Sequence, residues 1–204
     1  MTRPLAAVFL SLGLALLAPA ASANVAAGQA APDFTLTDIQ GKPQKLSAYR
    51  GKYVVLEWFN SECPFVQKHY ESGNMQSLQK RYGDKGVVWL TVNSTHPQSS
   101  NYRDPARSRE IARDWKINAA ASLLDPDGKV GQAYGARTTP QMWVIDPGGK
   151  VIFAGGIDDK ATFRTADVKD AKNFVAAALD ESMAGRGVST PAATPYGCSV
   201  KYKY

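Results

Sequence analysis

The chain contains two kinds of apolar pattern, short continuous apolar runs and stretches in which apolar residues recur at helical spacing. Short apolar runs rich in β-branched and aromatic residues, at 53–59, 87–92 and 123–124, predict buried strands. Apolar residues at helical spacing follow the first two runs and predict helices over 64–82 and 105–115, each opened by a proline. Ser72-Gly73-Asn74 is a candidate interruption of the first helix. Strands that alternate with helices in this way predict an α/β fold in three layers, with parallel strands at the centre of the sheet.

Two hairpins are predicted at the ends of this pattern. Residues 31–38 alternate between apolar and polar side chains and end before a turn signal that contains Gly and Pro. Near the other end, Pro147-Gly148-Gly149 separates two short apolar runs at 142–146 and 151–155. A last stretch with helical spacing, 166–183, predicts a closing helix. The central sheet is therefore expected to be mixed, with an N-terminal hairpin extension.

The first residues have the composition of a targeting segment. A short basic start is followed by an apolar run from Leu5 to Leu17 and by the small residues Ala21-Ser22-Ala23. This order is typical of a secretory signal peptide, which we assign to residues 1–23. One domain is expected over 24–183, followed by a tail over 184–204. The protein is then periplasmic or secreted, in a bacterial cell envelope, and contacts the membrane only if the signal remains uncleaved as an anchor.

Charge narrows the choice of partners. The chain has a formal net charge of +6, but its basic residues are interleaved with acids, as at 107–114. Such a pattern is typical of a solvated surface and not of a stripe that binds nucleic acid. No nucleic-acid partner is expected.

Cys63 is the residue with the clearest chemistry. It follows the buried run 53–59 and directly precedes Pro64, the first expected helical residue, so its sulfur is expected at a helix N-terminus. The unpaired N–H groups and the dipole at that end favour thiolate over thiol, and thiolate is the reactive form of cysteine. Cys63 is therefore predicted to be a nucleophile.

Cys198 lies in the tail. Residues 184–195 are rich in Ala, Gly, Pro, Ser and Thr without a hydrophobic period, which predicts a flexible linker long enough for Cys198 to reach Cys63. Two cysteines in an exported chain most often form one disulfide. A redox pair, a purely structural disulfide and two unpaired cysteines all remain open. The helix-terminal position of Cys63 favours the redox pair, because exposed or strained bonds at such positions are labile.

Several motifs resemble a known family. Thioredoxin-fold redoxins have features similar to Ala31-Pro32-Asp33-Phe34-Thr35-Leu36, to Cys63-Pro64 after a strand, and to Thr138-Thr139-Pro140 before Met142. More narrowly, the segments 63–66, 134–140 and 196–202 resemble the exported, peroxiredoxin-like branch of the alkyl-hydroperoxide-reductase and thiol-specific-antioxidant superfamily. The resemblance covers about residues 29–183. It implies a thioredoxin-like three-layer sandwich and a thiol-based, antioxidant type of oxidoreductase that needs no bound cofactor.

Two departures from better-known relatives bear on the reaction. In a thioredoxin-type site the second cysteine lies three residues after the first, where this chain has Val66. Typical peroxiredoxins carry Pro and Thr seven and three residues before the reactive cysteine, where this chain has Leu56 and Asn60. Exchange between neighbouring cysteines is therefore impossible, which leaves Cys198 as the candidate resolving cysteine, and the peroxide-binding loop is altered.

Further candidate site residues surround this pair. Arg137 resembles the arginine that steadies thiolate and peroxide in peroxiredoxins, with an ordinary surface arginine as the alternative. Thr139-Pro140 resembles the cis-proline turn of thioredoxin folds, whose backbone pairs with a cysteine-bearing segment of a substrate. Asn60 is expected either to donate a hydrogen bond to the sulfur or substrate, or to cap the helix start.

These observations support two hypotheses. The chain is expected to be an enzyme, a thiol-disulfide oxidoreductase or thiol peroxidase, that acts on a hydroperoxide or a protein disulfide and draws on a thiol electron donor. No metal site is predicted, because His69 and His96 lack a recognisable ligand spacing to the cysteines. The alternative is a non-catalytic thioredoxin-fold module that binds a protein or metal and holds a structural Cys63–Cys198 disulfide.

Overall fold

The computed structural model describes residues 24–203, so the predicted signal peptide lies outside the described residues. Within that range, no helix is long and apolar enough to cross a membrane. The strands are β1 Thr35–Asp38, β2 Pro43–Lys45, β3 Val54–Trp58, β4 Val88–Asn93, β5 Ala121–Leu124, β6 Thr138–Thr139, β7 Gln141–Ile145, β8 Val151–Gly155 and β9 Cys198–Ser199. The α-helices are α1 Pro64–Glu71, α2 Asn74–Gly83, α3 Pro105–Asp114, α4 Lys129–Tyr134 and α5 Phe174–Met183, and two 3₁₀ helices are η1 Leu46–Tyr49 and η2 Thr165–Asp170.

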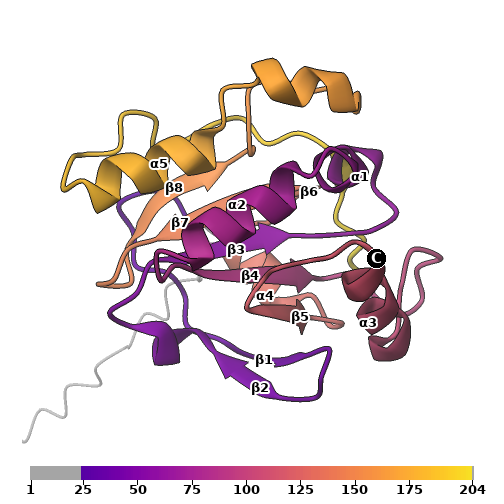
Figure 1. Ribbon diagram of the computed structural model, residues 1–204. Helices are drawn as coiled ribbons and strands as arrows, with labels where there is room; N and C mark the ends of the chain where they lie inside the picture. The colour runs from indigo at the N-terminus through magenta and orange to yellow at the C-terminus, as the bar shows by residue number, and fades with distance from the viewer. Residues whose placement is uncertain (1–23, 204) are drawn as a thin grey trace, which may run out of the picture.

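Seven strands form one mixed sheet in the order β2-β1-β5-β4-β3-β7-β8 (Figure 1). At its centre, β4 pairs in parallel with both β3 and β5. At one end β7 is antiparallel to β3 and β8, and at the other β1 is antiparallel to β5 and β2. The predicted α/β fold, mixed sheet and N-terminal hairpin are confirmed. The short pair β6 and β9 lies outside this sheet and joins the tail to the domain.

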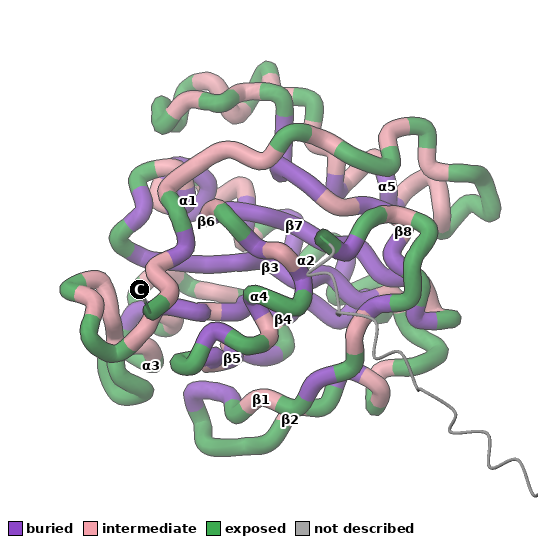
Figure 2. The backbone as a smooth tube through the Cα atoms, turned by 180° about the vertical axis from the view of Figure 1, so that it is seen from behind, coloured by how far each residue is buried: buried purple, intermediate pink, exposed green. Residues whose placement is uncertain are grey.

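The sheet separates two apolar clusters, because successive side chains of a strand point to opposite faces. Leu56 of β3 belongs to the cluster that contains Tyr134 of α4. Its neighbour Val55 belongs to the cluster that contains Val66 of α1 and Leu179 of α5. In Figure 2 the middle strands β3 and β7 are buried along most of their length, whereas β2 at the edge is largely exposed. Cys63 packs in the same cluster as Val55, on the α1 face.

Helix breaks follow from residues with special conformations. The predicted helix over 64–82 is divided into α1 and α2 by Gly73, whose φ of 74° is in the left-handed region. The predicted helix over 166–183 is wrong in its first half, which forms η2 and then an extended link. Asn173 ends this link by pairing with Asp158 and by accepting a hydrogen bond from Ala176 N–H at 2.8 Å as the cap of α5. A long-range contact thus sets where α5 begins.

The segment 184–203 has a defined path over the domain, seen in yellow in Figure 1. Ala192 bridges to Ala154 of β8, Cys198 pairs with Thr139 of β6, and Val200 is buried. The segment reaches Cys63, as its length predicts, while its flexibility stays a prediction.

Candidate active site

Cys63 lies in the turn between β3 and α1. Its backbone N–H donates to the Asn60 carbonyl at 3.1 Å, and its carbonyl accepts from the N–H groups of Val66 and Gln67 at 2.9 Å. It is therefore the N-cap of α1, and Pro64 is the first helical residue, as the sequence predicts. The Cys63 side chain is only 1% exposed. The sulfur thus lies at a helix N-terminus but is covered by other parts of the chain.

Asn60 holds the shape of this turn. Its Oδ1 accepts from the Glu62 N–H at 2.8 Å, and its Nδ2 donates to Thr95 Oγ1 at 3.1 Å. Glu62 in turn forms an ion pair with Arg103 at 2.8 Å. These contacts hold the turn before α1, whose N-cap is Cys63, so Asn60 does not cap the helix, and its role toward the sulfur or substrate stays a prediction.

Thr139 connects the two cysteines. The Cys63 sulfur donates to the Thr139 carbonyl oxygen at 3.0 Å. Thr139 and Cys198 are paired residues in the antiparallel ladder of β6 and β9, and the Thr139–Pro140 bond is cis, as the resemblance implies. Both cysteines are free thiols in this structure. The candidate residues Cys63, Thr139, Pro140 and Cys198 are therefore brought together.

The Cys198 thiol holds its proton firmly. Burial raises its pKa to about 12, with a smaller contribution from the neighbouring Cys63 side chain. The Cys63 side chain is thus close enough to affect the ionisation of Cys198. A thiol whose pKa is raised in this way is rarely ionised at neutral pH, so Cys198 suits the role of a partner better than that of an initial nucleophile.

In the described part of the chain, Arg137 lines a hollow that neither cysteine lines. Its exposed guanidinium donates to Asn24 Oδ1 at 3.4 Å, in a hollow that Trp143 and Pro195 also line. Its backbone carbonyl accepts from the Val200 N–H at 2.9 Å. The guanidinium thus has a surface position, and a role of Arg137 toward the thiolate or a peroxide stays a prediction.

Glu57 is a buried carboxyl group that the sequence analysis missed. It lies in the middle of β3 and accepts hydrogen bonds from the Trp89 indole and the Tyr70 hydroxyl, both at 2.8 Å. Burial raises the pKa of Glu57 to about 7, although these hydrogen bonds oppose the shift. One acidic residue in an otherwise apolar strand is the sequence signal that could have revealed it.

A second buried polar group links α1 to the tail. It consists of Lys68, His69, Asp158 and Tyr196, and we call it the Tyr196 cluster. Lys68 and His69 are completely buried and each lies 3.8 Å from an Asp158 carboxylate oxygen. Burial and the neighbouring charge of Lys68 lower the pKa of His69 to about 3. The sequence analysis considered His69 only as a metal ligand, and among residues 24–203 no group of His, Cys, Asp and Glu forms a metal-binding cluster.

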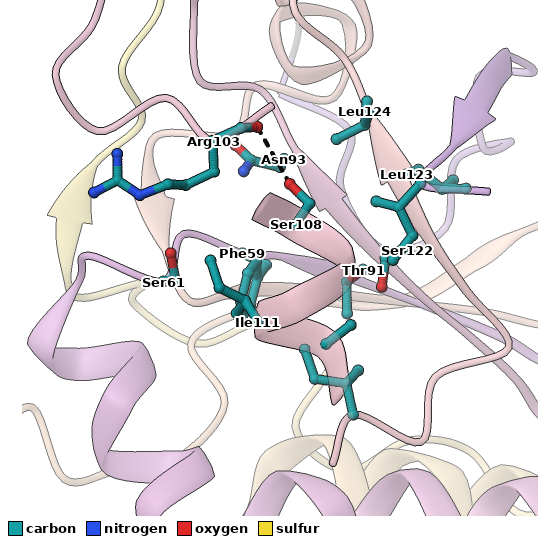
Figure 3. A pocket seen from close by; sticks show the side chains of 13 residues that line it. Phe59, Ser61, Thr91, Asn93, Arg103, Ser108, Ile111, Ser122, Leu123 and Leu124 are labelled. Atoms are coloured by element: carbon teal, nitrogen blue, oxygen red, sulfur yellow. Dashed lines mark hydrogen bonds between the residues drawn. The ribbon is translucent and has the colours of Figure 1, made fainter. Parts of the chain in front are cut away.

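A cavity lies beside the Cys63 turn, between α3 and the strands β4 and β5 (Figure 3). Apolar side chains, including Phe59 and Ile111, and the polar side chains of Ser61 and Arg103 line it. The dashed line in Figure 3 marks the bond from the Ser108 hydroxyl to the Arg103 carbonyl, at 3.2 Å. Within the described residues, neither cysteine lines this cavity, so it is separate from the thiol pair.

Comparisons with known proteins place the chain in a family. The profile of the AhpC/TSA family matches residues 27–154. The thiol-disulfide oxidoreductase ResA of Geobacillus thermodenitrificans is 32% identical over 127 residues, which are 62% of this chain and 67% of that relative.

Solved structures share the fold. A hypothetical protein from Sinorhizobium meliloti has a TM-score of 0.76 and 24% identity, over 87% of this chain and 94% of that chain. The thioredoxin domain of a thiol-disulfide oxidoreductase from Bacteroides vulgatus has a TM-score of 0.51 and 24% identity, over 63% and 87%. The predicted thioredoxin-like fold and the oxidoreductase class are confirmed by these comparisons together. The chain belongs to the AhpC/TSA family.

Proposed function

We propose that this protein is an exported thiol-disulfide oxidoreductase, with Cys63 as the attacking sulfur and Cys198 as the resolving cysteine. The observation that carries the proposal is the meeting of the two thiols beside Thr139. The similarity to a relative named thiol-disulfide oxidoreductase supports the reaction class. The signal-peptide pattern of residues 1–23 supports export to the periplasm or beyond.

The reaction proceeds by two thiol-disulfide exchanges. The Cys63 thiolate attacks one sulfur of a substrate disulfide, so a mixed disulfide forms and the other substrate sulfur leaves as a thiolate. Cys198 then loses its proton and attacks the Cys63 sulfur, which releases the second substrate thiol and forms the Cys63–Cys198 disulfide. Two electrons pass from the cysteine pair to the substrate. An external thiol donor returns them by the reverse exchanges.

Cys198, which is distant in the sequence, supplies the second thiol that a thioredoxin-type site has three residues after the first. Val66, where a thioredoxin-type site carries that cysteine, is fully buried in the α1 face of the core. The sulfur that resolves a mixed disulfide on Cys63 must therefore come from elsewhere in the chain or from another molecule. The strand pairing of Cys198 with Thr139, whose carbonyl oxygen lies 3.0 Å from the Cys63 sulfur, places a second thiol next to Cys63.

A protein disulfide is the substrate class that the geometry supports best. The backbone of β6 already pairs with an extended, cysteine-bearing strand, namely β9 of the same chain. Such backbone pairing suits an extended polypeptide substrate. Arg137, which would have to stabilise charge on a peroxide, has its hydrogen bond with Asn24 instead. Hydroperoxide reduction is therefore the weaker of the two activities that we predicted.

The test is reduction of a protein disulfide, such as those of insulin, at a low fixed concentration of dithiothreitol. The wild-type protein should accelerate reduction over many turnovers, and Cys63→Ser should reduce the rate to the background. Replacement of Cys198 by Ser should slow turnover, because dithiothreitol must then resolve the mixed disulfide on Cys63 from solution. Acceleration that survives Cys63→Ser contradicts the assignment of the nucleophile, and no acceleration by the wild-type protein favours the non-catalytic module.

A further inference from the structure

We propose that Tyr196 is a positioning residue, which holds Cys198 against Cys63 through its seat in the buried Tyr196 cluster. The inference rests on the proposed function, because it assumes that Cys198 resolves a disulfide on Cys63. Tyr196 would then be a functional residue outside the Cys63 and Thr139-Pro140 motifs. The cluster joins Tyr196, which lies close to Cys198 in the chain, to α1, the helix that Cys63 caps. It therefore holds the two reacting sulfurs near each other.

The hydroxyl of Tyr196 has three polar neighbours. It donates to Asp158 Oδ1 and accepts from Lys68 Nζ at 3.3 Å, and it lies 3.3 Å from His69 Nε2. The Lys68 and Asp158 side chains are 0% and 1% exposed. Buried charged groups are costly unless their partners are complete. The hydroxyl therefore has one favourable position, and the tail must be docked for Tyr196 to occupy it.

The partners of Tyr196 are themselves held in place. Lys68 Nζ donates to the Lys160 carbonyl at 2.7 Å, and Asp158 Oδ1 accepts from the Lys160 N–H at 2.9 Å. His69 Nδ1 lies 2.9 Å from the side-chain nitrogen of Asn74 on α2. The seat is thus built from α1, α2 and the loop after β8.

The Tyr196 cluster is connected through the chain to both cysteines. Lys68 and His69 belong to α1, the helix that Cys63 caps, and Tyr196 lies two residues before Cys198. Only Gly197 separates Tyr196 from Cys198. A Tyr196 hydroxyl fixed against α1 consequently fixes the Cys198 backbone against the start of the same helix.

Close backbone contacts show that the domain surface is shaped to receive the tail. A Cβ atom at Gly197 would lie 2.0 Å from the Thr139 carbonyl oxygen, the same atom that accepts from the Cys63 sulfur. A Cβ atom at Gly155 would lie 2.1 Å from the Ala193 carbonyl oxygen. The absence of side chains at these two glycines lets the segment around Tyr196 approach the domain this closely.

Replacement of Tyr196 by Phe removes the hydroxyl and keeps the ring. The ring lies 5.8 Å from that of Phe65, and the Lys68 ammonium lies 5.1 Å from its centroid, so both ring contacts can remain. Tyr82→Phe is a matched control, because the Tyr82 hydroxyl also makes a hydrogen bond, to the Ala176 carbonyl at 3.1 Å, between α2 and α5. Both variants therefore lose one hydrogen bond of the folded protein. Only Tyr196→Phe is expected to weaken the docking of the tail.

The first measurement equilibrates the wild-type protein and both variants with glutathione redox buffers and determines the fraction of Cys63–Cys198 disulfide by mass spectrometry. Weaker docking lowers the effective concentration of Cys198 at Cys63. Tyr196→Phe should therefore make disulfide closure about tenfold less favourable, which is a potential about 30 mV more positive. Tyr82→Phe should match the wild-type protein. An unchanged potential in Tyr196→Phe overturns the proposal.

The second measurement does not depend on the redox function. In the Cys63→Ser protein, Cys198 is the only thiol of residues 24–203, and iodoacetamide alkylation reports how well the tail is docked. Adding Tyr196→Phe should accelerate alkylation at least about tenfold, with no acceleration by Tyr82→Phe. An equal rate overturns the proposal. If neither the wild-type protein nor the two tyrosine variants form the Cys63–Cys198 disulfide, the proposed function is contradicted. The alkylation rates then still test whether Tyr196 holds the tail in place.

Discussion

The Cys63 sulfur lies 3.0 Å from the carbonyl oxygen of Thr139. Thr139 is also the residue that pairs with Cys198 across β6 and β9. One backbone position therefore contacts the nucleophile and aligns the strand that carries its partner. This relationship explains how a chain with Val66 at the position of the local second cysteine still presents two thiols to each other.

Cys198→Ser should trap the reaction after its first step. The mixed disulfide on Cys63 then has no neighbouring thiol to resolve it, so a covalent complex with the substrate should accumulate to about one per protein molecule. Non-reducing electrophoresis and intact mass measure this complex. The double variant Cys63→Ser with Cys198→Ser is the control and should form none. Unchanged multiple turnover in Cys198→Ser would show that another thiol resolves Cys63.

Gly197→Ala should push β9 away from β6. Gly197 has a φ of 131°, and a Cβ atom there would meet the Thr139 backbone at 2.0 Å. Gly185→Ala is the control, because Gly185 has a φ of 72° but nothing within 4 Å of its Cβ position. We expect closure of the Cys63–Cys198 disulfide to be at least about tenfold less favourable in Gly197→Ala than in Gly185→Ala. Equal values in the glutathione equilibrium would contradict the close approach of the tail.

Arg137→Ala should have little effect on disulfide exchange. The guanidinium is exposed and bonds to Asn24, and substitutions at such surface positions usually change free energies by no more than about 0.5 kcal/mol. The rate of insulin reduction should stay within about twofold of the wild-type rate. A parallel stopped-flow measurement of hydroperoxide reduction completes the test. A large loss in the peroxide reaction alone would restore Arg137 to the role that the family resemblance implies.

Stability should depend on pH through Glu57. Its pKa is raised from the ordinary 4.5 to about 7 in the folded protein, first of all by burial. Below pH 4.5 both the folded and the unfolded state hold the proton. Between pH 4.5 and about 7 only the folded state holds it, so the free energy of unfolding falls as the pH rises, and the loss is complete once the folded state is also ionised. Between pH 4 and 8 the wild-type protein should lose about 3 kcal/mol relative to Glu57→Gln in urea unfolding. A difference that does not change with pH would refute this effect.

Local sequence features predicted the elements that carry Cys63. A β-branched and aromatic run, polar turn residues and Pro64 act within a few residues of one another, and the structure places β3, the turn and α1 accordingly. Gly73 likewise divides α1 from α2 through its own backbone conformation. These parts were predictable because neighbouring residues determine them.

The remaining parts depend on contacts between distant residues. The start of α5 is set by the pairing of Asn173 with Asp158, and the path of the tail by Tyr196 in its buried seat. Neither contact leaves a periodic signal, and the composition of 184–195 indicates a linker. Arg137 shows the limit of a motif match, because the resemblance assigns its side chain to the thiolate and peroxide while the structure shows it donating to Asn24.

The reduction potential of the Cys63–Cys198 pair tests most directly whether these residues form an exchanging redox couple. The fully reduced protein is equilibrated with a series of thiol and disulfide buffers, quenched with acid and weighed by mass spectrometry after alkylation. We predict one two-electron transition, between the dithiol and the Cys63–Cys198 disulfide, at a potential above about −300 mV. A disulfide that stays closed well below −300 mV, as a structural clamp does, or a pair that never closes, would contradict this prediction.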